Sequence, residues 1–299
     1  MVRIQSGAPY SIRDGRISPN KPSAGRETEL AECGGAIAAA LHMRGMNSLH
    51  LVNPQWIKSF GQQKLRRNKS DTADAKLIAR FLKAEQHELR PWQPRSPQQQ
   101  RITELSRHAD SLTQDAARLK TRLSAEPEKT VVASLERTIK FLEKEIKSIR
   151  KGILTTIKSD AGLLAKYKLL KTIPGIGDVA AQIVIAELPD LSEFEDARQL
   201  AAWSGLTPRH FQSGTSGKTQ TPITKIGSVR LRRGLFMPAM TARNNNPLLK
   251  TFCDRLKENG KKPKQVIIAI MRKKLLHQIY GILKSGLPYN PEKRGFIES

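Results

Sequence analysis

The chain has 299 residues, and its 52 Lys and Arg against 27 Asp and Glu give a net charge of +25. This length allows two domains and a sizeable core, and the charge favours nucleic acid as the partner over a merely basic, ribosome-associated role. No apolar run reaches about 18 residues and no apolar signal segment opens the chain, so no membrane partner is expected. The two cysteines, Cys33 and Cys253, lack a metal-binding spacing, which excludes a structural zinc site and is typical of a cytoplasmic protein.

The N-terminal part combines weak order with an α/β alternation. Residues 1–26 are rich in Gly, Pro, Ser and Arg, so we expect them to be poorly ordered apart from a hairpin at residues 12–17. A short buried strand at residues 49–52 is followed by two helices, the second of which begins at Asp71. The alternation ends at the proline-rich segment 90–94.

Two long helices follow. Apolar residues recur with alternate spacings of three and four over residues 102–123 and again over 132–153, with a break at Glu126-Pro127. The pattern predicts an antiparallel hairpin or a dimerisation stalk, with a helical linker packed on its own domain as the alternative. Basic helices fill the rest. The predicted parts are an incomplete N-terminal domain, a coiled-coil stalk and a C-terminal domain, at residues 1–94, 95–165 and 166–299.

A glycine-rich turn opens the C-terminal domain. The segment Ile173-Pro-Gly-Ile-Gly177 between two apolar helices is typical of a helix-hairpin-helix. Gly175 and Gly177 would let the backbone approach a phosphate, and N–H groups of the next helix would bind it. This predicts contact with the DNA backbone without sequence readout, and the alternative is an ordinary turn.

A second glycine-rich segment contains two serines whose hydroxyl groups are candidate nucleophiles. Ser213 and Ser216 lie in a glycine-flanked loop together with Arg209, His210 and Lys218. A serine that attacks a phosphodiester needs an exposed hydroxyl and nearby cations, both of which this loop offers. The alternative is a solvated connector.

A basic helix follows this loop. Phosphate contacts are expected from Lys225, Arg230, Arg232 and Arg233, which precede or open a helix whose other face is apolar. A solvated helix face is the alternative interpretation.

A carboxylate pair stands upstream. Asp71 and Asp74 are three residues apart at the start of a predicted helix, so their side chains share one face and can share Mg²⁺. The alternative is that Asp71 caps the helix and Asp74 adds favourable charge to its first turn.

Taken together, these motifs resemble the DEDD-type transposases of bacterial insertion sequences, the bridge-RNA-guided recombinases. The resemblance covers roughly residues 49–290. The segments that carry it are VNPQWIKSF, NKSDTADAKLIARF, RPW, LKTIPGIGDVAAQIVIAEL, LAAWSGLTPRHFQSGTSGK, ITKIGSVRLRRGLFMPAM, LKENGKK and MRKKLLHQIYGILKSG.

The resemblance implies a resolvase-like (RNase H-like) α/β N-terminal domain, a coiled-coil stalk and a mainly α transposase domain. Asp71 and Asp74 match the last two acidic metal ligands of the family, and Ser213 matches the serine that forms a phosphoserine link with DNA. Mg²⁺, double-stranded donor and target DNA, a guide RNA and a homo-oligomer, dimer or tetramer, with active sites built between subunits are likewise implied. Arg209, Lys218, Arg230 and Arg232 would neutralise the phosphate.

The start of the chain departs from the family pattern. Neither the Gly-x-Asp-x-Ser/Ala-Lys strand nor the Glu-Ala-Thr-Gly strand end is present, and the pattern sets in near Gly45. We therefore expect a truncated or altered N-terminus over residues 1–45, loss of two metal ligands and poor recombination. The alternatives are a non-catalytic nucleic-acid-binding regulatory fragment and a junction resolvase that cuts by metal alone.

Overall fold

The chain divides into two compact units, Met1–Arg95 and Ser96–Ser299. The computed structural model describes residues 2–4, 10–13, 16–19, 38, 41–45, 49–52, 54–63, 71–85, 87, 89, 92–208, 223–224, 227–245 and 247–291.

All the strands that the structure describes belong to the first unit. β1 (Val2–Ile4) pairs in parallel with β4 (His50–Val52), and β2 (Tyr10–Arg13) pairs antiparallel with β3 (Arg16–Pro19). The second pair confirms the predicted hairpin, because its register places Ile12 opposite Ile17. Residues 1–26, expected to be poorly ordered, thus contain three strands, in which Val, Ile and Tyr supply β propensity.

Among its described residues the first unit also contains the helices α2 (Pro54–Gln63) and α3 (Asp71–Glu85), and residues 41–43 are helical as well. α2 and α3 enclose a small core of Val52, Ile57 and Phe81. The helix predicted to begin at Asp71 is confirmed. The strand predicted at residues 49–52 is confirmed with a start at residue 50, but it is not fully buried, since Leu51 is 48% exposed. A two-stranded sheet covers only part of such a strand.

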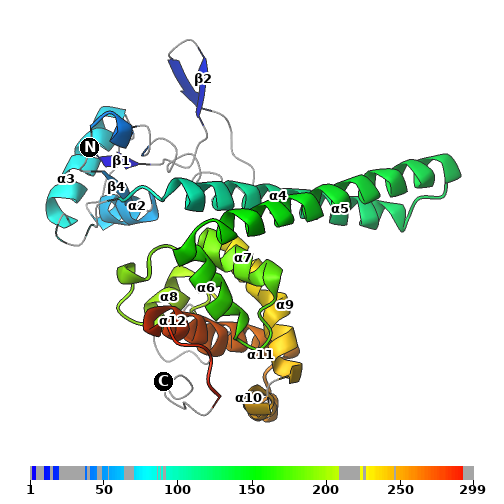
Figure 1. Ribbon diagram of the computed structural model, residues 1–299. Coiled ribbons are helices and arrows are strands. Elements are labelled where there is room, and N and C mark those ends of the chain that lie inside the picture. Colours follow the sequence, from blue (N-terminus) through cyan, green and yellow to red (C-terminus); the bar gives the residue numbers. More distant parts are fainter. Residues whose placement is uncertain are drawn as a thin grey trace. The chain divides into compact units, whose positions relative to one another are not determined.

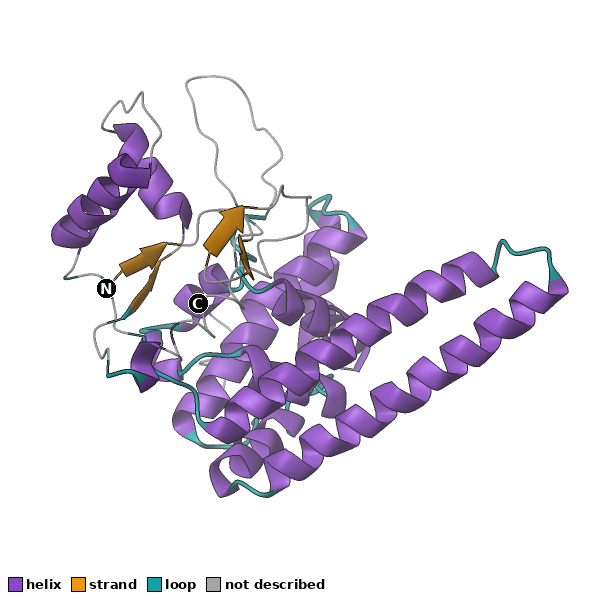
Figure 2. Cartoon of the chain, turned by 90° about the horizontal axis from the view of Figure 1, so that it is seen from above, coloured by secondary structure: helices purple, strands orange, loops and turns teal. Residues whose placement is uncertain are grey.

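A long helical hairpin opens the second unit. α4 (Pro97–Leu123) and α5 (Lys129–Lys158) run side by side in opposite directions and extend past the other helices of that unit (Figure 1; Figure 2 shows the same hairpin from above). Ser96 caps α4 by accepting from the Gln99 N–H, and the chain reverses before Glu128 caps α5. The predicted antiparallel hairpin is confirmed, and its seam buries the apolar positions Ala109, Ala116, Leu135 and Ile139.

The remaining helices of the second unit form a bundle around one apolar core. Their bounds are α6 (Ala161–Lys171), α7 (Asp178–Glu187), the 3-10 turn η1 (Leu191–Glu193), α8 (Ala197–Trp203), α9 (Val229–Asn245), α10 (Pro247–Glu258), α11 (Pro263–Ile270), the π-helical turn η2 (Met271–Leu275) and α12 (Leu276–Ser285). Ile102, Ile153 and Ile157 at the base of the hairpin are fully buried in the same core. Hairpin and bundle therefore share a core across the boundary predicted near residue 165.

The described chain is mostly helical, as predicted for everything beyond residue 95. Only two-stranded sheets occur among its described residues, so the RNase H-like character of the N-terminal part stays a prediction. Of the helices that the structure describes, none combines the length and apolarity that a membrane span requires.

Candidate functional site

The two ends of the predicted serine loop are held together by the backbone. The Thr224 N–H donates to the Thr207 carbonyl at 2.8 Å, and Pro208 and Ile223 form an isolated antiparallel bridge. The chain is therefore paired at both ends of the segment 209–222, and we call this pairing the stem, with one arm before residue 209 and the other after residue 222.

Several predicted site residues fall in this loop or beside it, outside the described residues. They are Arg209, Ser213, Lys218 and Lys225. The stem and its supports are consequently the part of the candidate site whose geometry the structure gives.

Gly227 presses the second arm of the stem against the end of α8. Its φ of +130° is a conformation that L side chains rarely adopt, and a Cβ at this position would lie 1.9 Å from the Trp203 carbonyl oxygen. Only glycine fits such a close approach of two backbones. The glycine thereby holds the second arm against the end of α8.

Arg232 secures the first arm. Its Nη1 donates to the Ser204 carbonyl oxygen at 2.7 Å, just past the end of α8, where carbonyl groups lack intrahelical donors. A charged donor makes this a strong hydrogen bond, and burial lowers the pKa of the Arg232 guanidinium. The structure thus places a predicted phosphate contact on the support of the stem.

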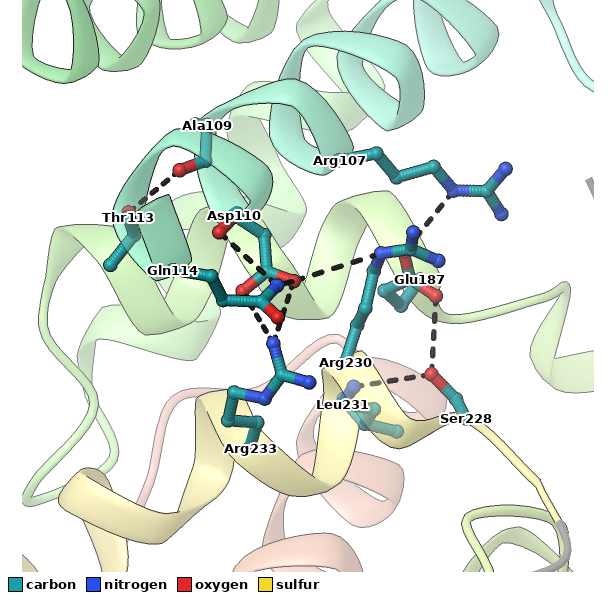
Figure 3. A network of polar contacts seen from close by, with 10 residues as sticks. All are labelled: Arg107, Ala109, Asp110, Thr113, Gln114, Glu187, Ser228, Arg230, Leu231 and Arg233. Atoms are coloured by element: carbon teal, nitrogen blue, oxygen red, sulfur yellow. Dashed lines mark hydrogen bonds and ion pairs between the residues drawn. The ribbon is translucent and has the colours of Figure 1, made fainter. Parts of the chain in front are cut away.

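A second set of polar contacts fixes the start of α9 (Figure 3). Ser228 Oγ accepts from the Leu231 N–H at 3.1 Å and donates to Glu187 Oε2 at 3.1 Å. The other carboxylate oxygen of Glu187 lies 3.6 Å from Arg107 Nε on α4. Because the Glu187 side chain is only 8% exposed, these partners offset the cost of burying its charge. Glu187 links the end of α7 to α4 and α9.

Asp110 of α4 engages two arginines that the sequence predicted as phosphate contacts (Figure 3). Arg233 Nη1 donates to both of its carboxylate oxygens, at 3.1 and 2.9 Å, and Arg230 Nε lies 3.9 Å away. Gln114 donates to the same carboxylate at 3.0 Å. The charge of Asp110 also acts on Arg150 of α5, and of the two arginines in contact with the carboxylate Arg233, 48% exposed, is the one open to an external anion.

The predicted helix-hairpin-helix segment consists of α6, a turn and α7. Gly175, with a φ of +96°, packs against α9, where a Cβ would lie 2.6 Å from the Pro238 carbonyl oxygen and 2.9 Å from Ala242. Its missing side chain therefore serves packing inside the protein. A Cβ at Gly177 would meet nothing within 4 Å, so of the two glycines this one faces space that a ligand can enter.

A carboxylate already lies at the start of α7. Asp178 accepts from the Tyr167 hydroxyl at 2.6 Å and from the Lys171 ammonium. These hydrogen bonds, that of Lys171 first, lower the pKa of Asp178, while burial and the bond to Asp178 raise the pKa of Tyr167 to about 12. The lowered pKa keeps Asp178 ionised and the raised pKa keeps Tyr167 protonated as its donor, so the charge of Lys171 is met by a carboxylate.

The predicted metal pair lies on α3. Asp71 is its first residue, and its side chain is outside the described part of the chain, whereas Asp74 is half-buried. Within the described residues no three His, Cys, Asp or Glu side chains come together as a metal site. The described side chains alone do not assemble a binding site for Mg²⁺.

Sequence reasoning missed the acidic residues that organise the arginines. Asp110 and Glu187 carry the network, and neither lies in a recognisable motif. A weak signal existed, since Asp110 directly follows the seam position Ala109 and Glu187 follows the apolar run 183–186. Acids are scarce in this chain, so each one beside a core position is a candidate partner for an arginine.

Two transposase family models match the chain. The one described as the IS116/IS110/IS902 transposase family matches residues 167–254, and a DEDD transposase model of the IS110 type matches residues 24–126. The second match begins ahead of Gly45, the predicted onset of the family pattern, so the likeness reaches further toward the N-terminus than predicted.

Three curated proteins that are similar to this chain agree with the family models. The pilin gene-inverting protein of Moraxella bovis is 33% identical over 245 residues, which cover 82% of this chain and 75% of that protein. The transposase for insertion sequence element IS1328 of Yersinia enterocolitica is 24% identical, with 68% of this chain and 67% of that protein covered. The transposase for IS1111A of Coxiella burnetii is 24% identical, covering 68% of this chain and 62% of that protein.

Proposed function

Because this chain belongs to the IS116/IS110/IS902 family of transposases, we propose that it cuts and joins DNA with Ser213 as the nucleophile. Membership of this family makes the chain a DNA transposase and recombinase of the insertion-sequence kind, with DNA as its substrate. The role of Ser213 lies beyond that membership.

The closed stem supports this role. A nucleophile must be held where a substrate phosphate can reach it, and positioning of this kind contributes strongly to catalysis. The pairing of Thr207 with Thr224, the glycine at position 227 and the bond from Arg232 to Ser204 all constrain the arms of the loop that contains Ser213. The ends of this loop are thus held, unlike those of a connector with free arms.

In the proposed reaction, the Ser213 oxygen attacks a backbone phosphorus of DNA. A serine oxygen–phosphorus bond forms as the bond from phosphorus to one deoxyribose oxygen breaks; the serine loses its proton and the leaving oxygen gains one. Joining is the reverse attack, by a deoxyribose hydroxyl of another DNA end on the phosphoserine. Charge on the phosphoryl oxygens would be met by Arg209 and Lys218, which share the loop with Ser213.

In this proposal the arginines of α9 mainly hold the protein together and do not all contact phosphate. Arg232 holds the stem, and Arg230 and Arg233 bind Asp110, so the helix is fixed against α4. Lys225 and the half-exposed Arg233 are then the cations near the stem that can reach a DNA phosphate directly.

Asp71 and Asp74 would hold Mg²⁺, which when bound supplies positive charge to stabilise the phosphoryl oxygens. The support for this pair is their position three residues apart on α3, which puts them on one helix face. We further propose a guide RNA and a homo-oligomer, dimer or tetramer, acting in the cytoplasm, on the strength of the family resemblance.

The first test is capture of a covalent adduct. The full chain is incubated with labelled double-stranded DNA, guide RNA and Mg²⁺ and run on a denaturing gel, beside Ser213→Ala and, as a matched control from the same loop, Ser216→Ala. The proposal expects the adduct in wild type and Ser216→Ala and its loss in Ser213→Ala. An adduct that survives in Ser213→Ala contradicts it. Salt-sensitive binding with no adduct, where an active relative forms one, favours the non-catalytic regulatory fragment.

A mixing experiment tests the shared active site. Ser213→Ala and Asp71→Ala chains are assayed alone and together. Sites built from two subunits predict that each variant is inactive alone and that the mixture regains part of the adduct. A mixture as inactive as its components contradicts a site shared between subunits.

A further inference from the structure

The outer face of α5 carries a line of cations. Arg137, Lys140, Lys144, Lys147 and Lys151, called the cationic ridge below, are all exposed and are spaced by three, four, three and four residues. At 3.6 residues per turn these positions fall within a sector of about 80°, roughly opposite the buried seam of the hairpin. The ridge is therefore one continuous stripe, about 21 Å long at 1.5 Å per residue.

The cations of the ridge form no close ion pair among the described residues, although Lys147, after Lys120, helps to lower the pKa of Glu143. Among the described residues, none of the five forms an ion pair within 4 Å, whereas the neighbouring cations of α4 all do. On α4 the pairs are Arg118 with Asp115, Lys120 with Glu143 and Arg122 with Glu126. Two acids of α5, Glu136 and Glu143, border the ridge, and Glu143 is bound to Lys120 across the hairpin at 2.7 Å.

Like charges three and four residues apart repel, so the ridge costs stability in the free protein. An exposed aromatic ring borders it, since Phe141 is 61% exposed and lies four residues after Arg137. Unpaired cations beside an exposed ring indicate a surface for a partner rather than a solvated face.

We propose that the cationic ridge binds the phosphate backbone of duplex DNA. Duplex DNA carries about one charge per 1.7 Å, so roughly 12 phosphates lie along the length of the ridge and can match its five cations. The base of the hairpin shares its core with the helices that carry the serine loop, and Asp110 bonds to Arg233 across the same junction. DNA held on the ridge would therefore lie at a fixed distance from that loop.

This inference rests on DNA as the substrate and not on the identity of the nucleophile. Binding to a non-specific duplex measures it without guide RNA, cleavage or adduct formation. A failed adduct assay therefore leaves it standing, and a failed binding test leaves Ser213 untouched.

The test compares two variants of the full chain with equal loss of charge. The ridge variant carries Lys140→Gln, Lys144→Gln and Lys147→Gln, and the control carries Arg118→Gln, Lys120→Gln and Arg122→Gln on α4. Glutamine keeps helix propensity close to that of Lys and Arg, so both variants should fold. Fluorescence anisotropy with a random DNA duplex of roughly 30 base pairs, titrated over a range of salt concentrations, gives affinity and salt slope.

The ridge variant should reduce the slope of log K against log salt by about 2 to 3 and weaken binding by about tenfold or more near 0.1 M salt, because three phosphate contacts are lost. The control should change the slope by less than about 1. The thermal midpoint of the ridge variant should not fall, since repulsion is relieved. A second variant with Lys→Arg at the same three positions should bind as wild type. The same measurement is repeated with an RNA stem-loop as probe. Equal losses of DNA affinity in ridge variant and control, no loss of DNA affinity in the ridge variant, or a loss seen only with the RNA stem-loop would each overturn the proposal.

Discussion

Replacing Gly227 with alanine should open the stem of the serine loop. The new Cβ would lie 1.9 Å from the Trp203 carbonyl oxygen, so one arm must move by more than about 1 Å to regain contact distance. The φ of +130° adds about 1–3 kcal/mol of backbone strain for a residue with a side chain.

The movement also weakens the contacts that close the stem. The Thr224–Thr207 hydrogen bond is worth about 1 kcal/mol and the charged bond from Arg232 to Ser204 about 1.5–3 kcal/mol. The expected cost in the free energy of unfolding is therefore about 3.5–7 kcal/mol if both contacts are lost, and local opening of the stem caps the loss.

Urea unfolding and limited trypsin digestion measure the two outcomes. Cleavage within residues 209–222, at Arg209 and Lys218, should accelerate in Gly227→Ala. Gly152→Ala is the matched control, because a Cβ there meets nothing within 4 Å inside α5, and alanine should stabilise that helix by about 0.5–1 kcal/mol. A Gly227→Ala chain that unfolds within about 0.5 kcal/mol of wild type, with unchanged digestion, would refute the account of the stem.

Three further predictions concern the polar contacts of the second unit. Asp110→Ala should cost about 1–2 kcal/mol in urea unfolding, against at most about 0.5 for the exposed pair member Asp115→Ala, and equal costs would contradict the role of Asp110. Ser228→Ala should cost about 1–2 kcal/mol, since it caps α9 and bonds to a buried carboxylate, while Ser124→Ala on the exposed tip should cost less than about 0.5 kcal/mol; similar losses would argue against the cap. For Asp178, whose folded pKa is depressed below its ordinary 3.8, the stabilisation is present above that value and is lost as pH falls through the folded pKa. Acid unfolding should therefore show the advantage of wild type over Asp178→Asn above about pH 5 and its disappearance at lower pH, and an advantage that grows on acidification would show the sign to be wrong.

Local patterns predicted the helices well. The alternating spacing of three and four identified the hairpin, because residues with that spacing share a helix face whatever their partner is. The start of α3 at Asp71 and the turn before α7 likewise followed from residues adjacent in sequence. The pairing of β1 with β4 was not predicted, because it joins segments almost fifty residues apart.

Long-range pairing explains why the candidate site was predicted only in part. The sequence predicted phosphate contacts for Arg230 and Arg233, but the carboxylate that both of them contact lies 123 residues before Arg233. The closeness of Gly227 to Trp203 depends on how two arms meet around the loop, which no local spacing encodes. Gly175 was expected beside a phosphate and instead packs on α9, since glycine permits either approach.

The most direct test of the central claim is to locate the DNA on the protein. The covalent complex formed by the full chain with guide RNA and Mg²⁺ would be digested with nuclease and protease, and the peptide that retains a nucleotide would be sequenced by mass spectrometry. The account predicts a nucleotide phosphate on Ser213. A nucleotide on Ser216 or on any residue outside the loop, or DNA cut and joined with no nucleotide left on the protein, would contradict it.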